Sequence, residues 1–192
     1  MAIYGTVATT TDASTGGTGA TYQRRLFYAV GLHWIFYGDG TGLFWRTSAD
    51  GITWSAANAM TVTPPATDSD HISVAFDGTS FHYALSSQQV APWNKVYYRK
   101  GTANADGTIT WAAAEQLVAT ITNLAVTVGS IVIDSSGFPW ITFGYQIAAE
   151  VVTSSTSNGT WTNDATKAKD LASGGSAGYT TFAVALSAGK VY

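Results

Sequence analysis

The sequence predicts an all-β protein built from repeated four-stranded antiparallel sheets. Three observations support this prediction. Short segments of alternating or continuous apolar residues fill the chain, and Gly, Asp and Ser separate them. Asp-Gly or Asn-Gly turns that precede a Thr and a Trp recur along it. The same order of segments precedes each of these turns, as expected of an internal repeat.

The turns have the sequences SADGITW over 48–54, NADGTITW over 104–111 and TSNGTW over 156–161. Gly adopts positive φ without steric cost, and an Asp or Asn side chain bonds the backbone of its own turn. Each copy therefore predicts a tight turn that leads into a strand beginning with Thr and Trp. We expect the three Trp residues, Trp54, Trp111 and Trp161, to be largely buried.

The repeat divides the chain into units near 22–60, 70–118 and 128–168, with a partial fourth unit over 178–192. Residues 1–21 are expected to form a strand and a Gly/Thr-rich linker. The segment 111–124, WAAAEQLVATITNL, has the most helix-like composition, but it follows a strand start and becomes rich in Thr and Val, so it is predicted as strand and loop. A unit of four antiparallel strands is the size of a β-propeller blade. The prediction is thus an incomplete propeller of about three and a half blades.

Composition narrows the classes of function. Only 11% of the 192 residues are charged, the net charge is −3 and the pI is near 5.4. These values argue against a nucleic-acid partner or an anionic membrane surface. The chain has no Cys and three scattered His residues, so no metal site and no cofactor are expected. The N-terminus lacks the features of a secretory signal, and a virion or extracellular location is favoured.

The turns resemble the Asp-boxes of the sialidase-type (BNR-repeat) β-propellers. The motif of that family runs Ser-x-Asp-x-Gly-x-Thr-Trp between the third and fourth strands of a blade. The resemblance covers about residues 22–192 and implies a propeller fold in which these turns stabilise the blades. The matching residues are Ser48, Asp50, Gly51, Thr53 and Trp54, then Asp106, Gly107, Thr110 and Trp111, then Asn158, Gly159, Thr160 and Trp161.

The catalytic residues of sialidases are not matched. The resemblance implies a cluster of three Arg, an Asp acid/base and a Tyr–Glu nucleophile pair. Arg24 or Arg25 in YQRRLFY occupies about the place of the first Arg, without the Pro that follows it in the family. The remaining Arg and Glu residues lie in other contexts: Arg46, Arg99, Glu115 and Glu150. We therefore assign no catalytic residue, and keep Arg24 and Arg25 as candidate binding residues against the alternative of an exposed strand-end pair.

Aromatic side chains offer a second candidate site. Trp93 lies among Gln, Pro and Asn, so it is the Trp expected to be exposed and able to stack on a sugar ring. Trp34, Trp45 and Trp140 are expected to fill the spaces between sheets. The turn-forming role is the default for the Asp residues after other strands, which are Asp39, Asp77 and Asp134.

The sequence favours a non-catalytic structural or binding module. Its low charge and its content of Thr, Ser, Gly and Ala suit a phage or virus structural protein, such as a tail, fibre or decoration protein, with a glycan as a candidate ligand. The alternatives are part of an exo-sialidase-type glycoside hydrolase, or a surface carbohydrate-binding protein. An open propeller leaves strand edges and apolar faces bare, so we expect the rest of a longer polypeptide or neighbouring subunits to cover them.

Overall fold

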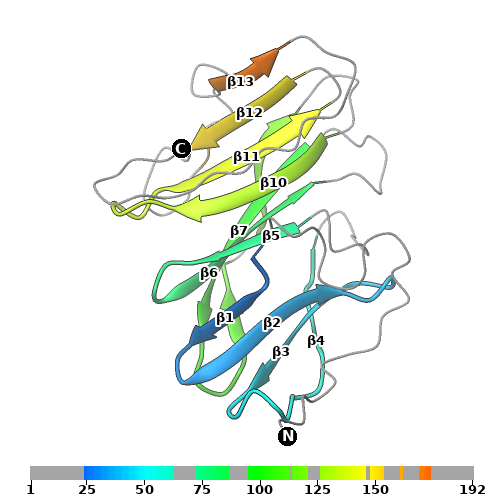
Figure 1. The fold of residues 1–192 in the computed structure, drawn as a ribbon, viewed down its shortest axis with the longest axis vertical. Coiled ribbons are helices and arrows are strands. Elements are labelled where there is room, and N and C mark those ends of the chain that lie inside the picture. The colour runs from blue at the N-terminus through cyan, green and yellow to red at the C-terminus, as the bar shows by residue number, and fades with distance from the viewer. Residues whose placement is uncertain are drawn as a thin grey trace, which may run out of the picture.

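The computed structural model describes residues 24–62, 72–86, 95–112, 114–120, 126–145, 148–153, 161 and 169–173. Every regular element in these ranges is a β-strand, and all strand pairs are antiparallel. The strands form three sheets that follow one another along the chain and along the long axis of the molecule (Figure 1). The all-β, antiparallel prediction is therefore confirmed for the described residues.

The first sheet contains β1 (Leu26–Ala29), β2 (Leu32–Gly38), β3 (Leu43–Ser48) and β4 (Asn58–Ala59), paired in that order. Val30 and Gly31 join β1 to β2 with φ values of 47° and 80°, and two positive φ values give the twist that a two-residue hairpin needs. In the next turn Asp39 Oδ1 accepts a hydrogen bond from the Thr41 amide at 2.8 Å. Local turn chemistry therefore sets this meander.

The second sheet contains five strands. They are β5 (Ile72–Phe76), β6 (Ser80–Ser86), β7 (Lys95–Ala103), β8 (Ile109–Trp111) and β9 (Gln116–Thr120). Both β8 and β9 pair with β7, so the strand predicted after the Asp-Gly turn forms in two pieces. The segment 116–120 is a strand and not a helix, as predicted, and the sheet extends to Thr120 rather than ending at 118.

The third sheet contains β10 (Val126–Ile133), β11 (Pro139–Tyr145), β12 (Ala148–Thr153) and β13 (Lys169–Ser173). Its fourth strand differs from the expectation, because it lies at 169–173 and Trp161 belongs to no strand. The expected strand at 1–21, the partial unit at 178–192 and the turn residues Asn158, Gly159 and Thr160 lie outside the described residues.

The three sheets can be superposed position by position through their first hairpins. The pairs that close these hairpins are Ala29 with Leu32, Asp77 with Ser80 and Asp134 with Phe138. Because side chains alternate along a strand, each sheet has two faces, and each face has its equivalent in the other two sheets. We call the face turned toward the preceding sheet the backward face, and the other the forward face. In Figure 1 the first strand of the third sheet, β10, lies at the edge of its sheet nearest to β5, with β11, β12 and β13 farther out.

Two apolar clusters hold the stack together. The first lies between the first and second sheets around Phe81, whose ring is fully buried and lies 5.0 Å from those of Trp34 and Phe36. The second lies between the second and third sheets and includes Tyr98 and Phe143, both fully buried. Each such side chain contributes about 1.5–3 kcal/mol by leaving water. Sheet-on-sheet packing is therefore the main source of stability.

The Asp-Gly turn of the second sheet also joins two sheets. Trp45 Nε1 in β3 donates to the Gly107 carbonyl oxygen at 3.1 Å. Gly107 has φ of 85°, and a Cβ atom there would lie 2.6 Å from Thr47 Oγ1. Only glycine therefore allows this turn both its conformation and its close approach to the first sheet.

Replacing Gly107 by Ala should lower the free energy of unfolding by clearly more than positive φ alone explains. A non-glycine residue at positive φ costs about 1–2 kcal/mol. Gly78→Ala is the matched control, because Gly78 has φ of 100° but a methyl group added there would meet no atom within 4 Å. Urea unfolding of both variants measures the difference, and equal losses would contradict the packing role of Gly107.

Candidate functional site

The first Asp-Gly turn is held by its own Asp. Asp50 Oδ1 accepts hydrogen bonds from the amides of Thr53 (2.7 Å) and Ile52 (2.8 Å) and from the Ser48 hydroxyl (2.9 Å). These bonds, that from Thr53 foremost, lower the pKa of the Asp50 carboxyl below its ordinary value. The carboxylate is thus committed to the turn, and the turn role predicted for Asp50 is confirmed.

The second turn uses the same chemistry. Asp106 Oδ1 accepts from the Thr108 hydroxyl (2.6 Å) and amide (2.9 Å), and Asn104 Nδ2 donates to the Thr110 hydroxyl at 2.9 Å.

Trp54, Trp111 and Trp161 are only half-buried, which is less than the sequence led us to expect. The side chains still pack, since the Trp111 ring lies 5.3 Å from that of Tyr83. Membership of the Asp-box family stays a prediction.

The arginines do not form the cluster that a sialidase requires. Arg24 is exposed but Arg25 is buried, so the two are not an exposed strand-end pair. Arg46 donates to the Tyr37 hydroxyl and the Ser55 carbonyl. Arg99 donates to the carbonyls of Ala112 and Thr61. Among these residues Arg24 is the one that lines a cavity described below.

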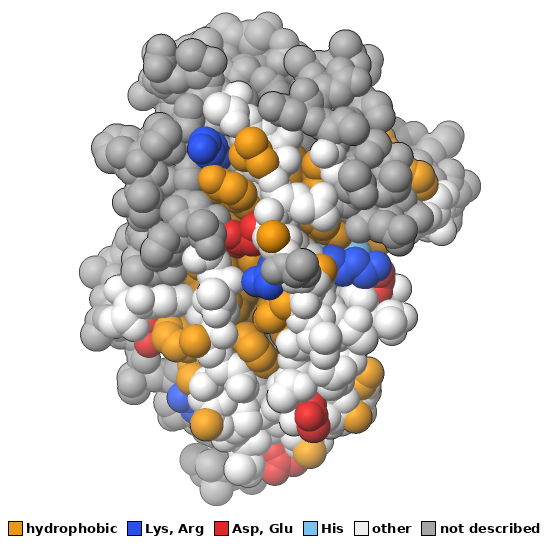
Figure 2. Space-filling model, turned by 180° about the vertical axis from the view of Figure 1, so that it is seen from behind, with side chains coloured by type: hydrophobic (Ala, Val, Ile, Leu, Met, Phe, Trp, Pro, Cys, Tyr) orange, Lys and Arg blue, Asp and Glu red, His pale blue; other side chains and the backbone are white. Residues whose placement is uncertain are grey.

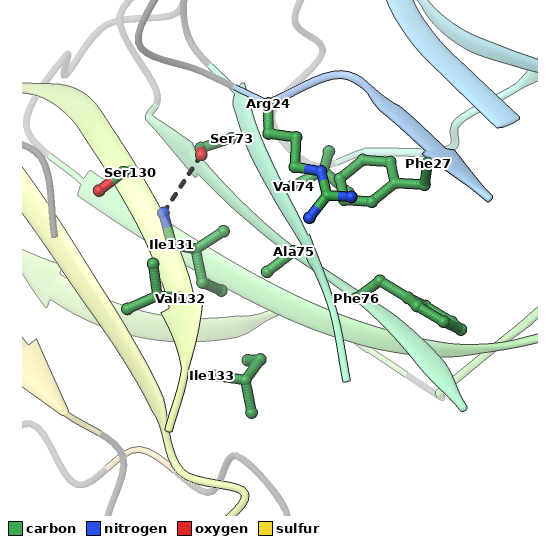
Figure 3. Close-up of a pocket in the computed structure, with 10 residues that line it drawn as sticks. All are labelled: Arg24, Phe27, Ser73, Val74, Ala75, Phe76, Ser130, Ile131, Val132 and Ile133. Carbon is green, nitrogen blue, oxygen red and sulfur yellow. Dashed lines mark hydrogen bonds between the residues drawn. The ribbon is translucent and has the colours of Figure 1, made fainter. Parts of the chain in front are cut away.

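That cavity lies between the first strands of the three sheets and has a volume of about 240 Å³. Seven of its ten lining residues are apolar, and Figure 3 shows the lining side chains coming from β5, β10 and the segment of β1 with the preceding Arg24. The Arg24 guanidinium lies 4.6 Å from the centroid of the Phe27 ring, and its Nε donates to the Leu26 carbonyl at 3.3 Å. The Ser73 hydroxyl accepts a hydrogen bond from the Ile131 amide at 3.2 Å across the two strands (Figure 3).

A second hollow of about 410 Å³ adjoins the first. Phe76 and Ile133 line both, so the two hollows form one groove along the first strands. The second hollow is polar, because Asp77 and Asp134 line it at the ends of β5 and β10. We call the two hollows together the inner-strand groove. It has an arginine at one end and two carboxylates at the other.

Asp77 joins the fully buried His82 to the surface. Its Oδ2 lies 2.9 Å from His82 Nε2 and 3.4 Å from Lys100 Nζ. Burial acts to raise the pKa of Asp77, but the hydrogen bonds from His82 and from the amides of Ser80 and Thr79 outweigh it and lower that pKa. The carboxylate is therefore ionised at neutral pH.

His82 is fully buried, and both of its ring nitrogens have partners. Burial lowers its pKa although Asp77 opposes this, so the ring is neutral. An ionised carboxylate can only accept, so Nε2 carries the proton and donates to Asp77. Nδ1 then accepts from the Tyr98 hydroxyl at 2.7 Å, and burial raises the pKa of Tyr98, so this hydroxyl keeps its proton.

Asp134 is held in an equivalent way in the third sheet. Its Oδ2 accepts from Trp140 Nε1 at 2.9 Å, and its Oδ1 accepts from the amides of Ser136 and Phe138. Burial acts to raise the pKa of Asp134, but these hydrogen bonds, that from Trp140 foremost, lower it. Both carboxylates of the groove are thus ionised and fixed in position.

These contacts reveal a hydrogen bond that repeats in all three sheets. Trp34, His82 and Trp140 occupy equivalent positions in the second strands. Each ring donates to the residue that ends the first strand: Trp34 to the Ala29 carbonyl at 2.9 Å, and the other two to the Asp carboxylates. Sequence reasoning assigned these Asp residues to turns but missed their ring partners. The sequence contains a signal for these bonds, because a Trp or His stands at the equivalent position of the strand that follows each turn.

One contact brings together two residues that the sequence does not connect. The Tyr83 hydroxyl donates to Glu115 Oε1 at 2.6 Å, between residues separated by 32 positions. Tyr83 is 1% exposed, and burial followed by the charge of Glu115 raises its pKa. The phenol is therefore protonated and inaccessible, which does not suit a nucleophile.

Trp93, the candidate stacking residue, lies outside the described residues.

Further features bear on ligands. In the described ranges no group of three or more His, Asp or Glu side chains is placed to hold a metal ion. The same part of the chain contains no helix long and apolar enough to span a membrane. On the face shown in Figure 2, charged side chains are few among the residues that are coloured.

Several solved structures resemble the chain, including two enzymes. One is a polysaccharide lyase of family PL25, an ulvan lyase bound to -[GlcA(1-4)Rha3S]-, with a TM-score of 0.52 and 11% identity over 76% of this chain. The other is a GH43 β-1,3-galactosidase, with a TM-score of 0.52 and 10% identity over 89% of this chain. Both are propeller folds, which supports a propeller-like arrangement of the sheets. The chain spans 42% and 39% of their lengths.

No family model matches the chain. No curated protein matches it either.

The pair of the buried His82 and Asp77, which is not buried, should make stability fall as the pH drops from 7 to 5. His82 is neutral in the folded protein, whereas an unfolded His takes up a proton below about pH 6.5, which favours unfolding. Below about pH 4 the unfolded Asp77 is protonated while the folded carboxylate is still ionised, so stability falls further. Urea unfolding between pH 7 and 3 measures both steps.

His82→Gln is the control for the first step. Its amide can still donate to Asp77 but does not titrate, so the decline between pH 7 and 5 should become shallower. An unchanged decline in this variant would assign the pH dependence to other groups.

Proposed function

We propose that the chain is a non-catalytic, saccharide-binding propeller module whose ligand lies in the inner-strand groove. One observation carries this proposal: the groove combines apolar walls with an arginine at one end and two fixed carboxylates at the other. Such a combination of a mainly apolar surface with a few placed polar groups is typical of small-molecule sites.

The chemistry of the groove matches that of a sugar. Carboxylate oxygens accept charge-assisted hydrogen bonds from sugar hydroxyls, and Asp77 and Asp134 are ionised and line the polar end. The apolar faces of a sugar ring suit the side chains of Phe76 and Ile133, which line both hollows. Arg24 offers a planar, permanently charged group for the acidic substituent of a uronate or sulfated sugar.

The protonation states favour binding over cleavage. Glycosidic bond cleavage needs a carboxylic acid whose pKa is raised so that it can donate a proton. Both carboxylates of the described groove have lowered pKa values. The nearby candidates for other acid or base roles, His82 and Tyr83, are buried at 0% and 1% exposure.

The solved relatives support a carbohydrate-related role. Both the PL25 ulvan lyase and the GH43 galactosidase process glycans. Their likeness to this chain is one of fold, so the ligand is inferred from the groove itself. A sialidase-type activity has no support in the positions of Arg24, Arg46 and Arg99, and the virion role suggested by composition stays a prediction.

Arg24→Gln should weaken the binding of a uronate-containing disaccharide by about tenfold or more, because one hydrogen-bonded charge is lost. Isothermal titration calorimetry measures the affinity, and NMR amide shifts at Ser73–Phe76 and Ser130–Ile133 locate the ligand. The same substitution should weaken the binding of a neutral disaccharide of equal length by less than about twofold.

Arg46→Gln is the matched control, since it removes the same charge from a side chain that bonds Tyr37 and Ser55. It should leave binding unchanged. Equal weakening by both variants would assign the effect to net charge. Cleavage of either disaccharide, or no saccharide binding at all across acidic and neutral probes, would overturn the proposed function.

A further inference from the structure

The first sheet has an uncovered apolar face. On β1 the side chains of Leu26 and Tyr28 are 54% and 64% exposed, and Val30 in the following turn is 43% exposed. Leu26 and Tyr28 alternate with the buried Phe27 and Ala29, so they form one row on the backward face. Their cross-strand partners, Ile35 and His33, extend this face onto β2 and are half-buried.

The same face of the second sheet is covered. Leu26 is equivalent to Val74, which is 3% exposed, and His33 is equivalent to Phe81, which is fully buried. The cover is the forward face of the first sheet: the rings of Phe27 and Trp34 lie 5.5 Å and 5.0 Å from that of Phe81. Within this molecule, therefore, a backward face is covered by the forward face of another sheet of the same repeat.

A matching forward face is present at the other end of the stack. In the third sheet Val132 and Trp140 are equivalent to Phe27 and Trp34, and both are half-buried, whereas the next pair on this face, Ser130 and Thr142, is buried. The first and third sheets lie at opposite ends of the stack of described sheets (Figure 1). Among the described residues no further sheet packs on either of these two faces.

We infer that a second copy of this chain covers the first sheet, with the forward face of its third sheet on the backward face of the first. The contact repeats the packing between the first and second sheets, so Val132 of one copy faces His33 of the other. A two-fold pair makes this contact twice and contains six of the described sheets, within the roughly four to eight blades typical of a closed propeller. A ring of three copies would contain nine, and an open chain would leave both ends exposed. The expected assembly is therefore a closed dimer.

The double substitution Leu26→Asp with Tyr28→Asp tests the surface. Both side chains are more than half exposed in the single copy, so the folded monomer should tolerate the charges, while burial of two carboxylates would disrupt the dimer. Light scattering after size exclusion should show a dimer for the unchanged chain and a monomer for the variant. Leu117→Asp is the matched control, because Leu117 is 37% exposed on β9 of the second sheet, and it should remain dimeric.

Cross-linking tests the pairing. The chain has no Cys, so His33→Cys and Val132→Cys each introduce the single thiol. A short bismaleimide should join the two proteins when they are mixed, and should join neither protein to itself. A monomeric unchanged chain, a dimer that survives the two Asp substitutions, or cross-links within one variant alone would overturn the inference.

Discussion

A sheet that is apolar on both faces must be covered on both, and this requirement governs the molecule. In the second sheet Val74 and Tyr83 pack toward the first sheet, whereas Ala84 and Tyr98 pack toward the third, and all four are buried. Strand periodicity produces the two rows, and the short turns keep successive strands in register. The stack of sheets follows from this, because no sheet of this kind is stable in isolation.

The groove is a consequence of how the first strands meet. β5 presents Ser73 and Ala75 toward β10, and these small side chains leave space that larger ones would fill. A register shift between Val128 and Ser130 interrupts the β10 ladder, and beside it the Ile131 amide donates to the Ser73 hydroxyl. The buried polar groups are thus satisfied without closing the cavity. At the polar end, ring N–H groups hold the carboxylates in place before a ligand arrives.

The parts of the fold that could be predicted from the sequence are those set by local chemistry. Alternating apolar residues and Asp-Gly turns were sufficient for the first three strands of each sheet and for the turn bonds of Asp50 and Asp106. The fourth strands of the first and third sheets do not begin at Trp54 and Trp161 as predicted. The division of β8 from β9 was missed, because it depends on how both pair with the distant β7. The position of β13 was missed for the same reason, since only its pairing with β12 defines it.

The candidate site was harder to predict, because its residues come from three sheets. Asp77 and Asp134 were recognised as turn residues, but neither their ring partners nor their convergence on one hollow can be derived from spacing alone. Arg24 and Arg25 are adjacent in sequence yet differ in burial, since the alternation of exposed and buried side chains in β1 already begins at these two preceding residues. Sequence periodicity predicts which residues share a face of a sheet. The groove depends in addition on how the three sheets stack on one another.

The proposed ligand site and the proposed dimer share one physical origin. Residues from the first strands of all described sheets line the groove. A second copy that continues the stack places its own first strands next to those of the first copy. A saccharide that contacts strands of both copies would bind the pair more tightly than a single copy, and by reciprocity would stabilise the pair by the same free energy. Such coupling needs no rearrangement within a sheet, because the site is extended by addition of strands and not by their movement.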